Sequence, residues 1–512
     1  MLFNQLETQF IDKFKLQSYN RFSGDQNVFE VDQMIGRKAE INELNRLYHT
    51  DKAQLVAVYG RRRVGKTYLI DEAFKGRITF RHAGLSPVEL GSDGKGALKI
   101  QLQNFYFSLQ LAGEKNIRCP KSWLEAFFML EEYLEKNDHG ERQVVFLDEM
   151  PWMDTPRSGF VTAFEAFWNN WGCHRENLMV IVCGSANSWI RDKLINSHGG
   201  LYNRVTHVIK LEPFSLKECR EFYEYNNVIM SDYDIARSYM TIGGIPFYMG
   251  YMEPGLSFPQ NVDKLFFSKG AKLEGEFDRL FDSAFSSPEA MKTIVTALYS
   301  RRAGLTRKEL IAVTGIENGG TLTQYLNALI TSDYIISYIP FGSGKREERY
   351  KLSDPFCIFW LHFSDRAKSS QSNHFWQEND LSQEVISWSG LAFENLCFNH
   401  IDQIKTALGI SGISTACSPW IRKENGEKGM QIDLIIDRKD NVVNMCEIKF
   451  YSSEFSVDKN YHMILMDRCN AMIEMLPKKK TVHSTLITTY GLKPNAYSGD
   501  FTNVITLEDL VR

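Results

Sequence analysis

The sequence predicts an α/β protein of several domains. We expect a parallel-sheet domain with a helical lid, then a small helical unit that ends in a β-hairpin, and a small α/β domain at the carboxyl end. Three observations predict this order: a glycine-rich loop between strand and helix at 54–70, an apolar strand at 143–147 that ends in two acids, and an acid-bearing strand pair at 430–450. Apolar strands that alternate with helices are typical of a parallel sheet covered on both faces.

The composition is that of a globular protein. Of 512 residues, 43% are hydrophobic and 24% are charged. A chain of this length exceeds one hydrophobic core, so we expect about three or four domains. The net charge of −4 gives no global basic field. A nucleic-acid site would therefore be a local patch.

Cysteine spacing and hydropathy narrow the class of protein further. The nine cysteines include no C-x-x-C pair, which favours buried, reduced thiols over zinc sites or disulfides. No apolar run is long enough to span a bilayer, and the N-terminus lacks the apolar core of a signal peptide. We therefore expect no membrane partner and a cytoplasmic location.

The stretch 54–70 carries the strongest signal. Its apolar run predicts a buried strand, and the following GRRRVGKT fits G-x-x-x-x-G-K-[ST] before a helix. Glycines let the backbone curl so that successive N–H groups face phosphate oxygens, and the helix N-terminus adds positive potential. We expect Lys66 to reach the β- and γ-phosphates of ATP and Thr67 to ligate Mg²⁺. The predicted nucleotide-binding residues of this loop are Gly60, Arg61, Arg62, Arg63, Val64, Gly65, Lys66, Thr67 and Tyr68.

Two acids follow the next strongly apolar strand, 143–147. We expect Asp148 to hold Mg²⁺, directly or through water, and Glu149 to orient and polarise the attacking water. The alternative is an acidic pair at the surface. A glycine-rich phosphate loop at ordinary distance upstream favours the catalytic interpretation.

Polar residues also follow the predicted strand 178–183. The end of the strand after the two acids is where a γ-phosphate sensor belongs, so Ser185 or Asn187 is the candidate, with an ordinary turn as the alternative. Arg204 precedes the strand 207–211. An arginine there can contact a γ-phosphate within the chain or from a neighbouring subunit of a homo-oligomer, or it can simply be solvated.

These segments resemble the archaeal and bacterial P-loop ATPases of the AAA+/STAND type. The similar segments are GRKAEI, VYGRRRVGKT, VVFLDEMPW, VCGSANSWI, LEPFSLKE and GGIPFYM, which lie within residues 34–255. The resemblance implies a P-loop ATPase domain with a parallel sheet and a helical lid, which binds and hydrolyses ATP with Mg²⁺. Residues 1–33 lie outside it as an N-terminal appendage, and 256–290 form a connector.

Residues 291–352 predict three helices followed by two strands, which is the pattern of a winged helix-turn-helix. The third helix, 320–330, would enter the major groove of DNA, and the wing would contact phosphate. Winged helices also bind proteins, and the wing carries Glu347 and Glu348, so both partners remain open. The candidate DNA contacts are Thr321, Thr323, Gln324 and Asn327 on the helix and Lys345, Arg346 and Arg349 in the wing.

An aromatic linker, 353–385, leads to the last domain, 386–512. There the strands 430–436 and 442–450 are joined by a short turn, which predicts an antiparallel hairpin. Alternation places Glu447 and Lys449 on one face, with Asp433 across the hairpin. Glu394 lies on a preceding helix.

This arrangement resembles the PD-(D/E)XK nucleases, whose small α/β domain is restriction-endonuclease-like. In such a site Asp433 and Glu447 would hold Mg²⁺ ions against a scissile phosphate, Lys449 would stabilise the attacking group, and Glu394 would complete the set. A chance pair of acids with a solvated lysine is the alternative.

Two functions follow from these predictions. The first is an ATPase coupled to a Mg²⁺-dependent nuclease-like domain that acts on DNA, with defence against foreign DNA as the hypothetical role. The second is a non-cleaving, ATP-dependent switch or DNA-binding regulator, whose C-terminal domain only recognises nucleic acid or a protein partner. A weaker third hypothesis is a scaffold that forms homo-oligomers on ATP.

Overall fold

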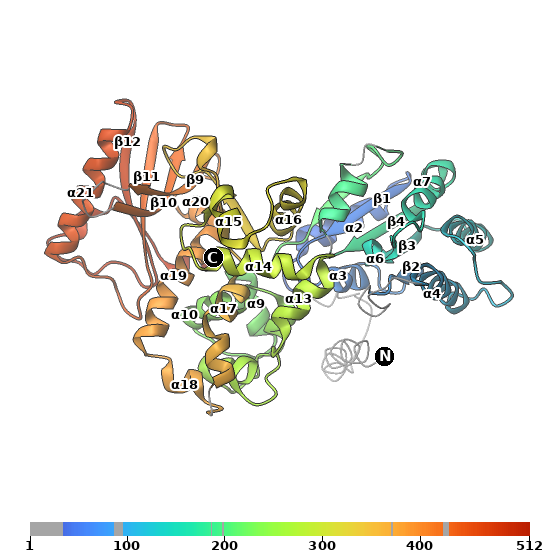
Figure 1. The fold of residues 1–512 in the computed structure, drawn as a ribbon, viewed down its shortest axis with the longest axis horizontal. Coiled ribbons are helices and arrows are strands. Elements are labelled where there is room, and N and C mark those ends of the chain that lie inside the picture. Colours follow the sequence, from blue (N-terminus) through green and yellow to red (C-terminus); the bar gives the residue numbers. More distant parts are fainter. Residues whose placement is uncertain (1–33, 87–95, 186, 197–198, 370–371, 423–429) are drawn as a thin grey trace, which may run out of the picture. The chain divides into compact units, whose positions relative to one another are not determined.

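The structure is a computed structural model that describes residues 34–86, 96–185, 187–196, 199–369, 372–422 and 430–512 (Figure 1). The predicted N-terminal appendage, 1–33, lies outside these residues. Contacts group Gly36–Arg512 into one unit, to which the elements below belong. Across the described ranges, the helices are too short or too polar to cross a membrane.

The first sheet is parallel, with the strand order β2-β3-β4-β1-β5 (Figure 1). Its strands are β1 (Gln54–Tyr59), β2 (Ile78–Ala83), β3 (Gln143–Asp148), β4 (Leu178–Gly184) and β5 (His207–Lys210). Strands β3 and β4 are buried along their whole length because helices cover the sheet. The predicted parallel sheet is confirmed. Strand β4 lies between β1 and β3, so the carboxyl ends of all three meet at one edge.

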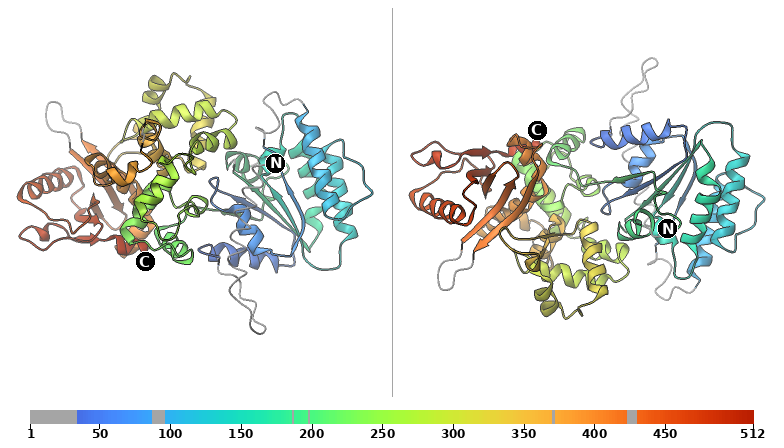
Figure 2. Two further views of the ribbon diagram at one scale, coloured as in Figure 1. Left: turned by 90° about the horizontal axis from the view of Figure 1, so that it is seen from below. Right: turned by 90° about the horizontal axis from the view of Figure 1, so that it is seen from above.

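Helices rich in aromatic residues pack beside this sheet. They are α2 (Lys38–Tyr48), α3 (Lys66–Ala73), α4 (Ala97–Leu111), α5 (Trp123–Lys136), α6 (Met150–Met153) and α7 (Phe160–Asn170). Figure 2 shows α4, α5 and α7 as a layer along the sheet. Phe105, Phe127 and Phe164 join them in one core with the strands. The layer fixes the sheet and leaves the carboxyl ends of β1, β3 and β4 available to the loops that follow them.

Short helices follow β4 and then β5. They are α8 (Asn187–Trp189), the π-helix η2 (Ile190–Ile195), α9 (Leu216–Tyr225), α10 (Asp232–Ile242), α11 (Pro246–Met249), α12 (Phe258–Val262), the π-helix η3 (Asp263–Phe267) and α13 (Glu276–Ala284). Ser215 and Glu218 form a reciprocal capping box that starts α9. Residues 256–290, which we expected to be a connector, thus contain three helices. Their aromatic side chains, such as Phe266 and Phe267, are buried.

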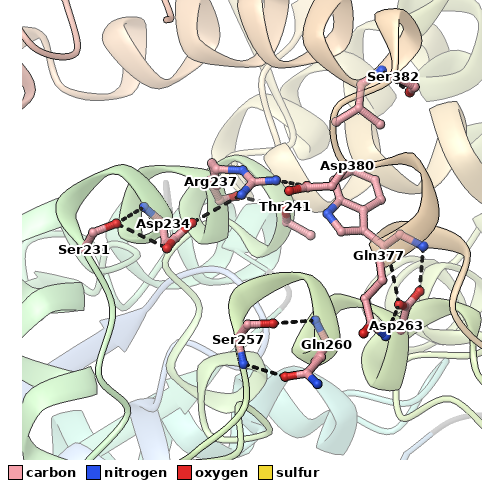
Figure 3. Close-up of polar contacts among 12 residues, drawn as sticks. Ser231, Asp234, Arg237, Thr241, Ser257, Gln260, Asp263, Gln377, Asp380 and Ser382 are labelled. Carbon is pink, nitrogen blue, oxygen red and sulfur yellow. Dashed lines mark hydrogen bonds and ion pairs between the residues drawn. The ribbon is translucent and has the colours of Figure 1, made fainter. Parts of the chain in front are cut away.

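The aromatic segment 353–385 forms helices as well, α17 (Pro355–Ser369) and α18 (Phe375–Asn379). Phe356, Phe359 and Phe363 are spaced so that one face of α17 is buried. Figure 3 shows how α18 is held: Asp263 accepts a hydrogen bond from the side chain of Gln377 at 3.0 Å, and Arg237 pairs with Asp380. The predicted linker is therefore a packed part of the helical region.

Three helices and a small antiparallel sheet lie between these segments. The elements are α14 (Pro288–Tyr299), β6 (Leu305–Thr306), α15 (Arg307–Thr314), α16 (Gly320–Thr331), β7 (Ile335–Tyr338), the short 3-10 helix η4 (Lys345–Glu347) and β8 (Arg349–Leu352), with sheet order β6-β8-β7. Thr306 caps α15 and forms a capping box with Glu309. The helices and strands expected from the sequence therefore lie in the expected order.

The last sheet is mixed, with the order β13-β12-β11-β10-β9. Its strands are β9 (Thr415–Arg422), β10 (Met430–Arg438), β11 (Val442–Lys449), β12 (Thr481–Thr488) and β13 (Asn503–Ile505), and its helices are α19 (Gln383–Asn399), α20 (Ile401–Ala407), α21 (Lys459–Met475) and α22 (Leu507–Val511). Strands β10 and β11 form the antiparallel hairpin, with Leu434 opposite Cys446. Asn441 turns the chain with φ 65°. Helix α21 connects the parallel strands β11 and β12.

His400 joins the start of α9 to the end of α19. Its Nε2 accepts a hydrogen bond from the Leu216 N–H at 3.1 Å, so the proton lies on Nδ1, which donates to the Leu396 carbonyl at 2.9 Å. Burial lowers the pKa of His400 from 6.5 to about 4. The folded protein therefore favours the neutral ring.

We predict that acidification destabilises this joint. Because the folded-state pKa is depressed, the stabilisation is complete above pH 6.5 and is lost as the pH falls toward 4, by up to about 3 kcal/mol. Urea unfolding of the parent and of His400→Gln between pH 7 and pH 4 measures it. The variant retains an acceptor but does not titrate, so its midpoint should fall less on acidification. Parallel curves would contradict the prediction.

Candidate nucleotide site and acidic set

The glycine-rich loop curls between β1 and α3 as the sequence predicts. Gly60 has φ 157°, and a Cβ there would lie 2.2 Å from the Leu211 carbonyl oxygen, so a side chain is excluded. Gly65 has φ 91° and a Cβ there would meet no atom within 4 Å, so its Cα faces open space at the start of α3. The loop thus offers main-chain N–H groups and a helix N-terminus to a phosphate.

Lys66 and Thr67, which we expect to contact phosphate and Mg²⁺, are held by hydrogen bonds at the start of α3. The Lys66 ammonium is buried and donates to the carbonyls of Gly60 and Arg61 at 3.0 and 3.1 Å, so it is held across the loop. The Thr67 hydroxyl donates to Asp148 Oδ2 at 2.8 Å. A hydroxyl beside a carboxylate is an oxygen pair that suits Mg²⁺, and these residues fit ATP with its metal ion.

Glu149 is held by Ser185. Its backbone adopts a left-handed conformation (φ 44°) directly after β3. Its carboxylate accepts hydrogen bonds from the Ser185 N–H at 3.0 Å and the Ser185 hydroxyl at 2.7 Å. Since β4 lies beside β3, the residue after β4 is adjacent to the residue after β3. Ser185 therefore fixes the direction of the carboxylate that we expect to act on water.

Asn187 lies behind the loop. It is fully buried, its Oδ1 accepts from the Gly60 N–H at 3.1 Å, and its Nδ2 donates to the Thr331 carbonyl at the end of α16 at 3.0 Å. It thus contacts both the phosphate loop and residues 291–352. Arg204 lies exposed in the turn before β5, and Tyr68 is 44% exposed on α3.

Two arginine side chains of the loop form ion pairs with acids far along the chain. Arg61 forms an ion pair with Asp354 at 2.7 Å, and both are almost fully buried. Arg63 pairs with the buried Glu276 at 2.7 Å and lies over the Phe247 ring. The loop therefore binds the downstream part of the chain by the side chains of Arg61 and Arg63. The other loop side chains differ: Arg62 lies over the Trp152 ring, and Val64 is buried.

The C-terminal acids form two groups. In the first, Glu394 on α19 and Asp433 on β10 share Arg302, which pairs with Glu394 and lies 3.8 Å from Asp433 Oδ1. Arg302 comes from the turn between α14 and β6. Burial, together with the charge of Asp433, raises the pKa of Glu394. The guanidinium thus offsets the repulsion between two carboxylates.

The second group surrounds Glu447, which is fully buried. Its carboxylate accepts from the Tyr461 hydroxyl at 2.7 Å and pairs with Arg468 at 2.5 Å, both on α21, and Lys449 lies 3.6 Å away. Glu447 and Lys449 are therefore on one face, as alternation predicts. Asp433 accepts from the Ile448 N–H between them at 3.3 Å, so the hairpin brings it next to this pair.

These acids do not fit a resident metal ion as they are arranged. Arg302 lies at the first group and Arg468 at the second, so each already has a cationic partner. Within the described part of the chain, no group of three or more His, Cys, Asp or Glu side chains is placed to hold a metal ion. A divalent ion would have to displace an arginine.

Sequence reasoning missed the partners of these groups. Asp354, Glu276, Arg302 and Arg468 are 293, 213, 92 and 21 residues from the groups with which they pair, as their numbers show. A single charged residue at such a separation carries no local pattern. Only the position of Arg468 could have been anticipated, because it lies on the helix that follows β11 and connects it to β12.

Residues 34–252 match the family described as "ATPase domain predominantly from Archaea". The match covers the loop, the acids after β3 and the helices up to α11. It supports ATP binding and ATPase activity for this domain, for which Mg²⁺ is the usual companion of the nucleotide.

The chain is also similar to individual archaeal proteins. An uncharacterised protein of Methanocaldococcus jannaschii is 22% identical over 421 residues, 81% of this chain and 87% of that protein. An uncharacterised ATP-binding protein of the same organism is 44% identical over 43 residues, 8% of this chain and 73% of that protein.

Among solved structures, the Walker-type ATPase PABY2304 of Pyrococcus abyssi matches with TM-score 0.44 and 20% identity, over 64% of this chain and 96% of that one. The ORC2 protein of Aeropyrum pernix in its ADPNP–ADP complexes matches with TM-score 0.39 and 15% identity, over 67% and 97%.

We predict that Ser185→Ala lowers the turnover of ATP about five- to tenfold, because one hydrogen bond of about 1 kcal/mol no longer positions Glu149. The affinity for ATP should be unchanged. Steady-state hydrolysis and equilibrium binding of a labelled nucleotide measure the two quantities. Glu149→Gln is the comparison, and it should bind ATP without hydrolysing it. Weaker ATP binding by Ser185→Ala with normal turnover would show that Ser185 contacts the nucleotide instead.

Proposed function

We propose that the chain is an ATP-controlled switch that binds DNA. In this proposal the ATPase domain senses nucleotide, residues 291–354 transmit its state, and the C-terminal domain responds. The observation that carries the proposal is the direct contact between the phosphate loop and residues 291–354. Arg61 pairs with Asp354, and Asn187 bridges the Gly60 N–H and the Thr331 carbonyl.

The roles in the nucleotide site follow from the described contacts. Lys66 would neutralise the β- and γ-phosphates, and Thr67 with Asp148 would hold Mg²⁺. Glu149, oriented by Ser185, would polarise the attacking water. The phosphates of a nucleotide in the loop would compete with the carbonyls of Gly60 and Arg61 for the Lys66 ammonium. Small movements of the loop would therefore reach Arg61 and its buried partner.

DNA is the partner that residues 291–352 favour when they are treated as a winged helix. The polar residues of α16 expected to read bases are all exposed, namely Thr321, Thr323, Gln324 and Asn327. In the wing Lys345 and Arg346 are exposed, whereas Arg349 donates to the Gly304 carbonyl at 3.1 Å and so has an internal role. Helix α16 would thus present one end to DNA and the other, at Thr331, to the nucleotide site.

Control of the C-terminal acids by Arg302 belongs to the same proposal. Arg302 and Lys351 belong to residues 291–354, and Arg302 pairs with Glu394. Burial lowers the pKa of Lys351, and the charge of Glu394 opposes that shift. The segment that contacts the phosphate loop therefore also contacts the C-terminal acids Glu394 and Asp433. A shift of this segment would withdraw Arg302 from Glu394 and Asp433.

A DNA-cleaving enzyme is the second candidate function. It is favoured by one observation, the hydrogen bond that places Asp433 at the centre of Glu447-Ile448-Lys449. The arginines at the acids favour a closed, non-cleaving state in the arrangement described. Arg204, exposed before β5, would act only on a neighbouring subunit's nucleotide if the chain forms a homo-oligomer.

The test of the switch is the affinity for DNA with and without nucleotide. We predict that the parent binds a fluorescent duplex with different affinities in ADP and in a non-hydrolysable ATP analogue, and that Asp354→Asn brings the two affinities together. The variant removes the charge opposite Arg61 but retains the acceptor for the Cys357 N–H. Loss of coupling of about 1–3 kcal/mol is the usual scale.

Asp380→Asn is the matched control, because Asp380 pairs with Arg237 away from the phosphate loop and from residues 291–354. It should retain the nucleotide effect. Equal DNA affinity in all nucleotide states of the parent would contradict the proposed switch. A nucleotide effect that persists in Asp354→Asn would show that a contact other than Arg61–Asp354 carries the coupling.

If the chain is the DNA-cleaving enzyme of the second candidate function, we predict that Arg302→Ala increases cleavage in Mg²⁺ or Mn²⁺ by about tenfold, which corresponds to about 1.4 kcal/mol of lost ion pairing. The measurement is cleavage of single- and double-stranded DNA with and without ATP. Arg302→Ala with Asp433→Ala is the control and should abolish the gain. No cleavage by either variant, with ATP hydrolysis intact, would leave the non-cleaving switch as the function.

A further inference from the structure

A basic cavity lies at the turn of the β10–β11 hairpin. It has a volume of about 260 Å³ and is lined by nine residues from the start of β9, the hairpin turn and the loop before β12. Its charged residues are Asp437, Arg438, Lys439, Lys479 and Lys480. We propose that this cavity binds backbone phosphates of a nucleic acid. The inference deepens the proposed DNA partner and rests on it.

The charge of the cavity departs from that of the chain. Four of its nine lining residues are lysine or arginine, whereas the whole chain has 59 among 512 residues and a net charge of −4. One acid, Asp437, lowers the formal charge of the lining from four to three positive. A local positive patch on an acidic protein is the electrostatic signature of a phosphate-binding surface.

Two of the four cations are available to a ligand. Lys480 pairs with Asp437, and Arg438 pairs with Asp440. Lys439 and Lys479 are both exposed, and neither has an ion-pair partner among the residues that the structure describes. Two ammonium groups with no internal role therefore line the same cavity, where the hydroxyls of Ser414 and Thr415 add hydrogen-bond donors.

The position in the hairpin favours a polymer over a small anion. Asp433 lies four to five residues along β10 from Asp437 and Arg438 of the cavity, which is about 13–17 Å at 3.3 Å per residue. Each strand of a duplex carries one phosphate per 3.4 Å of axis, so about four or five base pairs span this distance. One nucleic acid can thus reach the acidic set and the cavity together.

The chemistry of the lysines also favours the phosphates of a nucleic-acid backbone as the ligand. Lysine ammonium groups are strongly hydrated point charges on flexible stems, without the rigid fork of arginine. They suit phosphates that arrive at variable positions, as those of a backbone do. The cavity would therefore hold nucleic acid without reading its sequence.

The test compares two double variants of the full chain. Lys439→Ala with Lys479→Ala removes the available cations, and Lys75→Ala with Lys115→Ala removes two exposed lysines from the ATPase domain. Fluorescence anisotropy of a labelled duplex across salt concentrations measures affinity. For the cavity variant we expect a loss of about tenfold, and a slope of log K against log salt that is smaller by about 1.8, or 0.9 per phosphate contact. The control variant and ATP turnover in both should match the parent.

Equal affinities and slopes for the two variants would overturn the proposal while leaving the proposed function intact. Binding of inorganic pyrophosphate that depends on Lys439 and Lys479, with duplex binding unchanged, would also overturn it, because the ligand would then be a small anion. A parent that binds no duplex in any nucleotide state would remove the DNA partner itself. The two failures are thereby distinguishable.

Discussion

The buried ion pair between Arg61 and Asp354 is the interaction on which the packing of the ATPase domain against residues 291–354 depends. Each side chain is almost inaccessible to water. Two charges without solvent are tolerable only while they remain together, and removal of one partner from such a pair typically costs about 3–5 kcal/mol. Because Arg61 belongs to the phosphate loop, the loop has one preferred position relative to α17, and the Tyr334 ring beside the guanidinium encloses it further. Arg61 therefore belongs to the nucleotide site and also to the packing of that site against α17.

Residues 291–354 contact both the phosphate loop and the C-terminal acids Glu394 and Asp433. Thr331 and Asp354 lie against the phosphate loop, and Arg302 lies against the C-terminal acids. This segment has its own small sheet and packed helices, so in the proposed switch it would move as a body rather than bend at each contact. A body with charged contacts at two places exchanges one set of contacts for another when it shifts, which is how packed interfaces convert small displacements into two states. The arrangement needs no flexible linker, and the aromatic segment that we expected to be one is helical instead.

Sequence reasoning recovered the elements that local chemistry determines. The loop before Lys66, the cap at Thr306 and the hairpin turn at Asn441 all follow from residue types with few conformational alternatives. The insertion of β4 between β1 and β3 brings Ser185 to Glu149, and no local signal encodes strand order. Within 256–290, α12 and η3 were missed because they are short and η3 is of π type. Helix α13 was missed although Phe277, Leu280 and Phe281 have clear helical spacing. Arginine partners were missed because charge complementarity between distant residues leaves no trace in one sequence.

The three consecutive arginines occupy positions at which the phosphate-loop pattern accepts any residue. In this protein two of those positions are matched to single acids elsewhere, Arg61 to Asp354 and Arg63 to Glu276. A phosphate loop without these two arginines would keep its residues for phosphate, yet it would leave the buried Asp354 without its ion-pair partner and Glu276 with Arg279 alone. The positions of the motif that accept any residue therefore determine how this loop packs against the rest of the chain. The fixed positions supply only the phosphate chemistry that all such loops share.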